Sequence, residues 1–330
     1  MNRKSKFVLL VVTAVIIVSV GAAFWAFTQA MQAETNVRYV GLQNIVSEKM
    51  SKAILGIETN AKHVFDEVGR NLDSPEAVIA TMVRKTSLGP EVRGYFAAFV
   101  PDYFAEKGRW FEPYVHHVDS SEFVLDMVGS ARHDYTKSDW YVRGKDAEDG
   151  FWCDPYEYVD GTSMNGRYSS YVKPVYDANG RLACVCGADI TFEWLTKELQ
   201  QMDEQLKNDE LLNKYRLTRS LDFFSVVIDK DGSCIVYPDG KKLAIKDKGM
   251  LQDLTQKKSG TLDMTVGGVA STLYYGPIEG VNWSLAVVTP KDDTQKPTRT
   301  MGLALLAIAL IGIIITWIIC RRTSHEETKS

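Results

Sequence analysis

The sequence has few of the features that identify nucleic-acid-binding proteins, disulfide-rich proteins and metalloenzymes. Its 38 basic and 42 acidic residues leave a net charge of −4, which predicts no nucleic-acid partner. Its 5 cysteines are too few for a disulfide scaffold. His116 and His117 are adjacent on a predicted strand and would point to opposite faces, so they make no metal pair. We expect no catalytic residue, no metal and no cofactor.

Two long uncharged runs stand out against this ordinary composition, one at each end of the 330-residue chain. They extend from Phe7 to Phe27 and from Met301 to Cys320. A helix needs about 20 apolar residues to cross a membrane, and both runs have that length. The first run is longer than the core of about 7–15 residues in a cleaved signal peptide, so an uncleaved anchor is the better interpretation. The sequence predicts transmembrane helices at residues 7–28 and 301–320.

Basic residues flank both runs on their outer sides. Arg3, Lys4 and Lys6 precede the first run, and Arg321 and Arg322 follow the second. Because such flanks stay in the cytoplasm, both ends of the chain are expected inside. We predict a multi-pass protein of the inner (cytoplasmic) membrane with the following segments: a cytoplasmic N-terminus at 1–6, an extracytoplasmic domain at 29–300 and a cytoplasmic tail at 321–330.

The extracytoplasmic part begins with a helical stripe of apolar residues. They recur three or four apart, at Val46, Met50, Ile54, Ile57, Ala61, Val64, Val68 and Leu72. This period predicts a long stalk helix that continues the first membrane segment. The stripe can pack on its own domain, on a second copy of the chain, or on both, and we expect a homodimer.

Strand patterns dominate the remainder of the extracytoplasmic part. Strands are predicted at 92–100, 110–115, 123–128, 171–176, 182–188, 223–228, 234–237, 272–278 and 283–288, with a charged helix at 192–216. The stretches 171–185 and 274–288 share the order strand, proline, turn, strand, as a weak internal repeat. The expected fold is α+β, with a membrane-distal module at about 75–190 and a membrane-proximal module at about 217–290.

A cluster of aromatic residues in the distal module suggests a binding site. Its members are Trp140, Tyr141, Trp152, Tyr156, Tyr158 and Tyr168. Aromatic walls exclude water and stack against cationic groups, and a buried carboxylate among them would bind an ammonium group. Asp189 is the first candidate for that carboxylate and Asp154 the second. The alternatives are that the aromatic residues only fill a core and that Asp189 caps the helix beginning near Thr191.

With these features, the chain resembles the double-Cache extracytoplasmic sensor domains of bacterial transmembrane receptors. The resemblance covers residues 29–300 and is most specific in 139–195, where Trp-Tyr, Pro-Tyr and a strand–turn–strand ending in Gly-x-Asp-Ile follow one another. It implies two tandem PAS-like (Cache) modules on a long stalk helix flanked by two transmembrane helices. It also implies that the distal module binds a small molecule and that the chain passes the signal inward.

The resemblance implies site residues as well, and the sequence departs from them at two places. Trp140, Tyr141, Tyr156 and Asp189 match the pattern of amino-acid-sensing members. The place of their arginine holds Ser138 beside Lys137, and the place of a second acidic residue holds Tyr158. The partners of an amino acid's carboxylate are thus missing while the amine-binding aspartate remains. An amine or an amino-acid-like compound is the expected ligand, and the predicted ligand-binding residues are Trp140, Tyr141, Trp152, Asp154, Tyr156, Tyr168 and Asp189.

Three classes of function follow from these patterns. The preferred one is a non-enzymatic ligand sensor that signals to a cytoplasmic or membrane partner. The second is a ligand-binding or scaffold subunit of a membrane complex, or a truncated histidine kinase, chemoreceptor or phosphatase chain, because only ten residues follow Cys320. The third is an extracytoplasmic enzyme, for which the sequence offers no catalytic arrangement.

Overall fold

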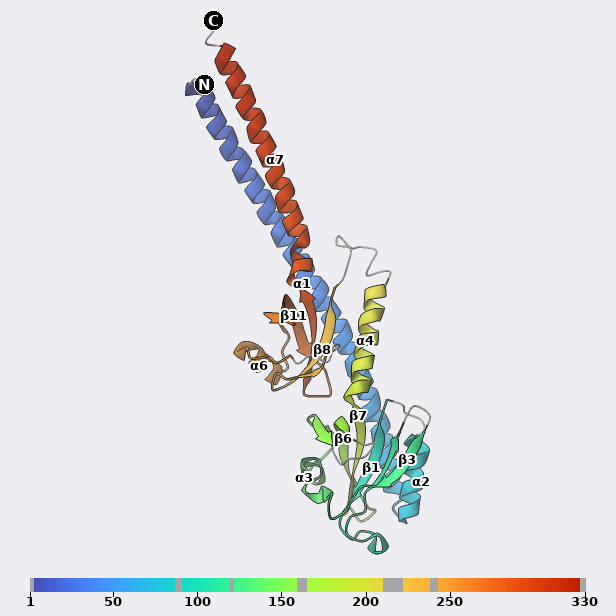
Figure 1. The fold of residues 1–330 in the computed structure, drawn as a ribbon. Helices are drawn as coiled ribbons and strands as arrows, with labels where there is room; N and C mark the ends of the chain where they lie inside the picture. Colours follow the sequence, from blue (N-terminus) through green and yellow to red (C-terminus); the bar gives the residue numbers. More distant parts are fainter. Residues whose placement is uncertain are drawn as a thin grey trace.

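The computed structural model describes residues 3–86, 91–118, 122–158, 165–209, 222–237 and 243–326. The molecule is elongated, with two long helices side by side at one end and two modules following in series (Figure 1). Each module is built on one antiparallel sheet. The predicted α+β fold, with two tandem modules on a long N-terminal helix and an apolar helix at each end of the chain, is confirmed.

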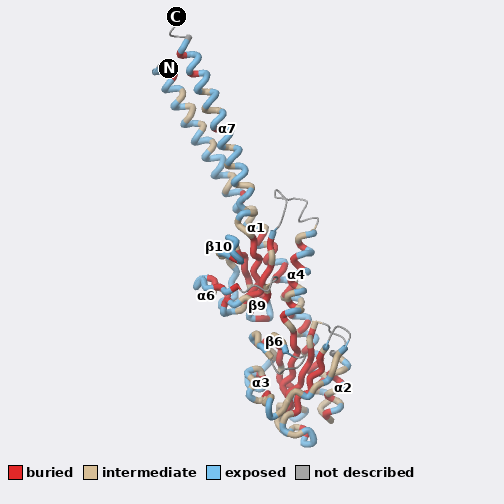
Figure 2. The backbone as a smooth tube through the Cα atoms, in the orientation of Figure 1, coloured by how far each residue is buried: buried red, intermediate tan, exposed pale blue. Residues whose placement is uncertain are grey.

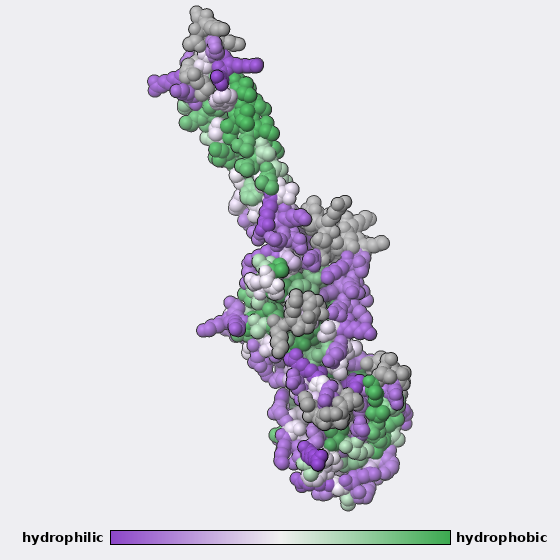
Figure 3. Space-filling view, in the orientation of Figure 1, coloured by the Kyte–Doolittle hydropathy of each residue, from purple (hydrophilic) through white to green (hydrophobic). Residues whose placement is uncertain are grey.

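The first apolar run and the stalk form one helix, α1 (Arg3–Arg70), of 68 residues. Helix α7 (Lys291–Glu326) runs back beside it (Figure 1). The two pack closely because α7 has glycines at the contact: a Cβ added to Gly302 would lie 3.0 Å from Phe24. Both helices are long and apolar enough to cross a membrane, and apolar side chains cover the outside of the pair (Figure 3).

The apolar stripe of α1 faces the two sheets of its own chain. Its residues Val46, Met50, Ile54, Ile57, Ala61, Val64 and Val68 are each at most 4% exposed. Buried residues gather in the sheets and along the side of α1 that faces them (Figure 2). Of the alternatives for the stripe, packing on its own domain is therefore the one that the structure shows. The expected homodimer stays a prediction and would need another surface.

The distal module contains one sheet with the strand order β3-β2-β1-β7-β6-β4, and β5 also pairs with β6. Its strands are β1 (Gly94–Phe99), β2 (Pro113–His117), β3 (Phe123–Met127), β4 (Phe151–Trp152), β5 (Tyr156–Tyr158), β6 (Gly166–Tyr176) and β7 (Leu182–Thr191). Its helices are α2 (Pro75–Thr86) and α3 (Asp139–Lys145), with short 3-10 turns η1 (Ala105–Lys107) and η2 (Tyr135–Lys137).

The two faces of this sheet have different neighbours. Tyr95 and Tyr171 point toward α1, where their rings lie 6.4 and 6.3 Å from the ring of Phe65. Phe96 lies opposite Tyr114 of β2 and Gly187 of β7 in the strand register. Because residues that are paired across strands share a face, these side chains line the face away from α1. That second face carries the site described below.

Helix α4 (Phe192–Asn208) connects the two modules. It begins directly after β7, and the hydroxyl of Thr191 caps it by accepting from the Trp194 amide at 3.2 Å. The helix predicted at 192–216 is thus present to residue 208, and residues 210–216 lie outside the described part.

The proximal module has the strand order β10-β11-β12-β8-β9. Its elements are β8 (Phe224–Asp229), β9 (Cys234–Val236), α6 (Lys248–Thr255), β10 (Gly260–Val266), β11 (Val269–Pro277) and β12 (Trp283–Pro290). Four of these strands fall where the sequence predicts them. Strand β10 was not predicted, although Leu262, Met264 and Val266 alternate with polar residues along it. The two repeated stretches form the hairpins β6-β7 and β11-β12.

The modules contact each other near the ends of β4 and β12. The rings of Trp152 and Trp283 lie 6.3 Å apart, and Asp154 forms an ion pair of 2.8 Å with Lys230. All five cysteines are free, and the Sγ atoms of Cys184 and Cys186 lie 3.6 Å apart in the core. The thiols of Cys153, Cys184 and Cys186 are buried.

Candidate functional site

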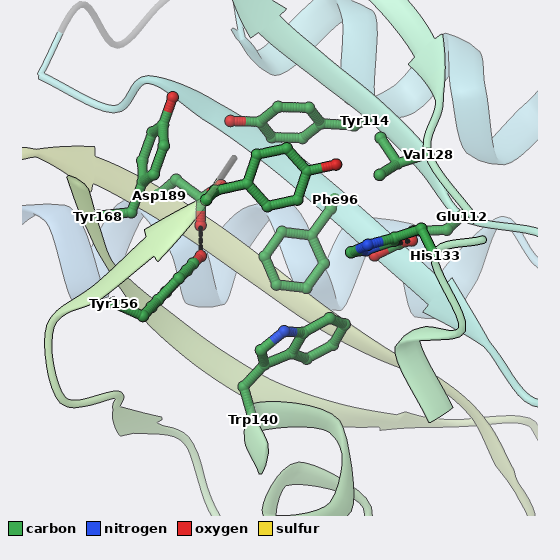
Figure 4. A pocket seen from close by; sticks show the side chains of 10 residues that line it. Phe96, Glu112, Tyr114, Val128, His133, Trp140, Tyr156, Tyr168 and Asp189 are labelled. Carbon is green, nitrogen blue, oxygen red and sulfur yellow. Dashed lines mark hydrogen bonds and ion pairs between the residues drawn. The ribbon is translucent and has the colours of Figure 1, made fainter. Parts of the chain in front are cut away.

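The candidate site is a pocket on the face of the distal sheet that points away from α1 (Figure 4). It encloses a cavity of about 60 Å³. The residues that line it come from five strands, from α3 and from the turns between them: Phe96, Glu112, Tyr114, Val128, His133, Trp140, Tyr156, Tyr158, Tyr168 and Asp189. The wall is mainly aromatic, and its charged groups are two carboxylates and one imidazole.

Asp189 lies at one end of the pocket, on the strand β7, and is 6% exposed. The Ser170 hydroxyl donates to Asp189 Oδ1 at 2.5 Å, and the Tyr156 hydroxyl donates to the same atom at 3.5 Å. Ser170 can hold this position because it pairs directly with Asp189 in the β6–β7 register. Burial raises the pKa of Asp189 to about 6, while the hydroxyls of Ser170, Tyr114 and Tyr156 hold it down. At neutral pH the group is therefore a buried carboxylate anion.

Aromatic rings form the middle of the pocket. The ring of Trp140 lies 4.7 Å from that of Phe96, and the rings of Tyr156 and Tyr168 are 6.2 Å apart. Phe96 fits against the sheet because Gly187 has no side chain: a Cβ there would lie 2.0 Å from Phe96 Cζ. Such rings present an electron-rich face that attracts a cation and keeps water away from it.

Glu112 and His133 lie at the other end of the pocket, across from Asp189 (Figure 4). Glu112 is 3% exposed, and its Oε2 atom is 3.7 Å from His133 Nε2. Burial raises the pKa of Glu112 well above its usual value, and the negative charge of Asp189 adds to this. Tyr158 packs edge-on against His133, with 5.5 Å between ring centres.

Four of the seven residues predicted to bind ligand line this pocket: Trp140, Tyr156, Tyr168 and Asp189. The structure brings these four together from α3, β5, β6 and β7, although they span fifty positions of sequence. Asp189 does not cap α4, since Thr191 supplies that cap. Their role in binding stays a prediction.

The other three predicted residues lie outside this pocket, and their role in ligand binding also stays a prediction. Tyr141 is 4% exposed and packs against Tyr135 at 5.3 Å between rings. Trp152 pairs with Tyr171 in the β4–β6 register, so it joins the core that faces α1. Asp154 is a surface residue, 51% exposed in its side chain and paired with Lys230.

Sequence reasoning did not assign Phe96, Glu112, Tyr114, Val128 or His133 to the site. One signal could have found two of them. Glu112, Tyr114 and His116 alternate along the predicted strand at 110–115 and its continuation, so they share a face, and an acidic residue in a buried strand calls for a function. Val128 and His133 carry no comparable signal, because only the fold brings the chain after β3 over the sheet.

Two basic residues near the site, Lys137 and Arg143, have partners outside it. Lys137 is 82% exposed in its side chain and pairs with Asp134 at 3.1 Å. Arg143 lies over the ring of Phe151, 4.4 Å from its centre, and pairs with Asp139 at 3.3 Å. None of the described residues that line the pocket is a lysine or an arginine. Within the described residues, no cluster of three or more His, Cys, Asp or Glu residues could hold a metal ion.

Comparison with known proteins adds the family of this module. Residues 79–197 match the family model described as methyl-accepting chemotaxis protein-like, first PDC sensor domain. This match agrees with the resemblance to Cache-type sensor domains that the sequence suggested. The match spans nearly all of the predicted distal module, and every pocket residue lies within it. A comparison with curated protein sequences gives no match.

Solved structures extend the likeness of the Cache-type domain over both modules. The extracellular domain of a chain designated histidine kinase mmHK1S-Z3 has a TM-score of 0.61 at 17% identity, covering 84% of this chain and 98% of that one. The periplasmic sensory domain of the Campylobacter jejuni chemoreceptor Tlp1 has a TM-score of 0.61 at 11% identity, covering 81% and 99%. The ligand-binding domain of the Pseudomonas fluorescens chemoreceptor CtaA, in complex with L-isoleucine, has a TM-score of 0.55 at 15% identity, covering 81% and 97%. At these identities the comparison establishes a shared fold.

Proposed function

We propose that the protein is a membrane-anchored sensor whose distal module binds a small amine outside the cytoplasm. The observation that carries the proposal is Asp189, a buried carboxylate at the end of an aromatic pocket without a lysine or an arginine among its described lining. An ammonium group placed there gains a charge-assisted contact in surroundings of low dielectric, together with the faces of Trp140 and Phe96. It would also supply Asp189 with a positively charged partner.

An α-amino acid fits this pocket less well than an amine. Its carboxylate would need a cationic partner, and Lys137 is turned outward to Asp134. The binding of L-isoleucine by CtaA supports a small-molecule ligand for this fold, whereas the lining of this pocket favours a cation.

The two apolar helices connect the sensor module to the opposite side of the membrane in this proposal. The basic flanks of α1 and α7 favour both ends of the chain in the cytoplasm and the two modules outside. Signalling then runs through α1 and α7 to a cytoplasmic or membrane partner. The described lining of the pocket contains no serine, threonine, cysteine or lysine that could act as a nucleophile, which favours a receptor over an enzyme.

Calorimetry on the full chain in detergent tests the amine site. Propylamine, propionate and L-alanine are titrated into the wild type and into Asp189→Asn. We expect propylamine to bind most tightly, and Asp189→Asn to weaken it at least thirtyfold, because removing one partner of a buried charged pair costs about 2–5 kcal/mol. Asp154→Asn is the matched control, since that aspartate is on the surface. Tighter binding of propionate, or unchanged propylamine binding in folded Asp189→Asn, would contradict the proposal.

A further inference from the structure

The pocket contains a second carboxylate, Glu112, which an amine bound at Asp189 would not engage. Glu112 directly precedes β2 and its side chain lies on the same face as Tyr114. The backbone fixes its position, because its carbonyl accepts from the Val128 amide at 3.0 Å. The chain passes close beside Glu112 at Gly129, where an added Cβ would lie 3.0 Å from Glu112 Cβ.

The Oε2 atom of Glu112 is buried and has no hydrogen-bond partner among the described residues. A buried carboxylate oxygen without a hydrogen bond is costly even beside an imidazole, so a donor supplied by a ligand would stabilise it. The titratable groups that face Glu112 are His133, Tyr135 and, across the pocket, Asp189. His133 Nε2 is 3.7 Å from Oε2, which is beyond hydrogen-bonding distance.

The two carboxylates are arranged for two separate positive groups. They lie at opposite ends of the pocket, with the rings of Phe96 and Trp140 between them (Figure 4). A single ammonium at Asp189 would therefore leave Glu112 without a donor. The cavity of about 60 Å³ has less than half the roughly 150 Å³ that accommodates a benzene-sized molecule, so the connection between the two groups must be short and narrow.

We propose that Glu112 is a second cation-binding group and that the pocket takes a short diamine, with one amino group at Asp189 and the other at Glu112. This inference rests on the proposed amine site at Asp189 and adds the class of amine. The alkyl chain between the amino groups would lie along Phe96 and Trp140. His133, at the edge of the Glu112 end, limits the length of the ligand.

Binding of the second amino group has a consequence that a merely structural Glu112 lacks. Burial favours the protonated form of Glu112 in the empty pocket. A cation placed beside it favours the ionised form, so the diamine releases a proton from Glu112 as it binds. A monoamine at Asp189 leaves Glu112 protonated and releases fewer protons.

The test compares propylamine with 1,3-diaminopropane by calorimetry on the full chain in detergent. Titrations are made in two buffers of different ionisation enthalpy, with the wild type, Glu112→Gln and Asp189→Asn. For the wild type we expect the diamine to bind at least tenfold more tightly and to release more protons. Glu112→Gln should lose the diamine preference, so that the two amines bind with equal affinity and equal proton release. Asp189→Asn should weaken both amines.

The possible failures are distinguishable. Equal wild-type affinity for the two amines, or a diamine preference that persists in Glu112→Gln, would overturn the second site while propylamine binding still supports Asp189. If neither amine binds, both proposals fail together. The wild-type preference and its proton release need no variant, so the test does not depend on the folding of Glu112→Gln.

Discussion

The two modules share one sheet plan but fill its outer face differently. In the proximal module, the face away from α1 carries Val226, Leu273, Ala286 and Val288, all fully buried, and α6 covers it with Met250 and Leu254. In the distal module the same kind of face carries Glu112, Tyr114, Tyr168 and Asp189 around a cavity. One backbone plan can thus hold either a packed core or a pocket, and the residues that point outward decide which.

Each module also has a buried aspartate in contact with its sheet: Asp189 in the distal module, and Asp203 of α4 beside the proximal one. Asp203 of α4 accepts from the Ser225 amide at 2.7 Å and from the Ser225 hydroxyl at 2.6 Å, which ties α4 to β8. Burial raises the pKa of Asp203 to about 6, as it does for Asp189. The same pKa therefore accompanies two different roles. Asp203 uses both oxygens within the fold, whereas Asp189 lines a cavity.

The largest expected effect is a loss of stability of the distal module alone, caused by a substitution in α1. Phe65→Ala should destabilise the distal core by about 3–5 kcal/mol, because Phe65 packs against Tyr95 and Tyr171. Thermal unfolding and propylamine calorimetry measure the result, and we expect binding to be lost with the fold of that module. The control is Tyr39→Ala, which removes the stacking partner of Tyr274 in the proximal module. Equal loss of binding in both variants would show that the modules do not fold separately.

The next effect uses pH to distinguish the two aspartates. An amine needs ionised Asp189, whose pKa is about 6, so its affinity should be constant well above pH 6 and fall as the pH drops through that value. Between pH 7.5 and pH 5 we expect a decrease of about tenfold, measured by calorimetry. The charged and titratable groups around Asp189 are Glu112, Tyr114, Tyr156, Tyr168 and His116.

Asp203→Asn is the matched control for this pH profile. It removes the other carboxyl with a pKa of about 6, so its propylamine affinity should decrease with the same midpoint as in the wild type. A flat profile in Asp203→Asn would contradict the assignment of the midpoint to Asp189.

Neighbouring aromatic residues allow a finer distinction within the distal module. Trp140→Ala should weaken propylamine about three- to thirtyfold, because a cation over an aromatic face gains about 0.5–2 kcal/mol. Tyr141→Ala should mainly lower the melting temperature, since Tyr141 is 4% exposed and packs on Tyr135. Calorimetry and thermal unfolding on both variants decide this. Weaker binding in folded Tyr141→Ala than in Trp140→Ala would reverse the assignment.

The smallest effect concerns the contact between the modules. Asp154 and Lys230 are 51% and 44% exposed in their side chains, and exposed ion pairs contribute about 0–1 kcal/mol. Lys230→Ala should therefore change the melting temperature slightly and leave propylamine affinity unchanged. An affinity change above threefold would show that the proximal module contributes to binding.

Helices, strands and their buried faces can be predicted from the sequence more reliably than contacts between residues far apart in it. The stripe of α1 and most strands follow from local periodicity, so Val46 through Val68 could be assigned to a buried face. The pocket depends on register, which joins residues far apart in sequence. Trp140 and Tyr141 are adjacent on α3 and point to different surroundings, and Trp152 turns inward because β4 pairs with Tyr171.

Glu112 illustrates why the remainder could not be predicted. Its distance from Asp189 is set by the strand order β2-β1-β7, in which a residue at position 112 and one at position 189 come to share a face. Nothing in the local sequence of either strand encodes that order. The aromatic cluster and Asp189 could be found because they lie in one stretch of about fifty residues with strong patterns.

The junction between β7 and α4 has no loop: the strand ends at Thr191 and the helix begins at Phe192. Asp189 is therefore two residues from the start of a stiff rod, and Asp203, eleven residues into the helix region, fastens that rod to β8. At about 1.5 Å per residue this rod spans roughly 17 Å. In mechanical terms, α4 connects the pocket at one end to the proximal sheet at the other. A displacement of the Asp189 backbone along β7 would therefore pass through α4 to Ser225.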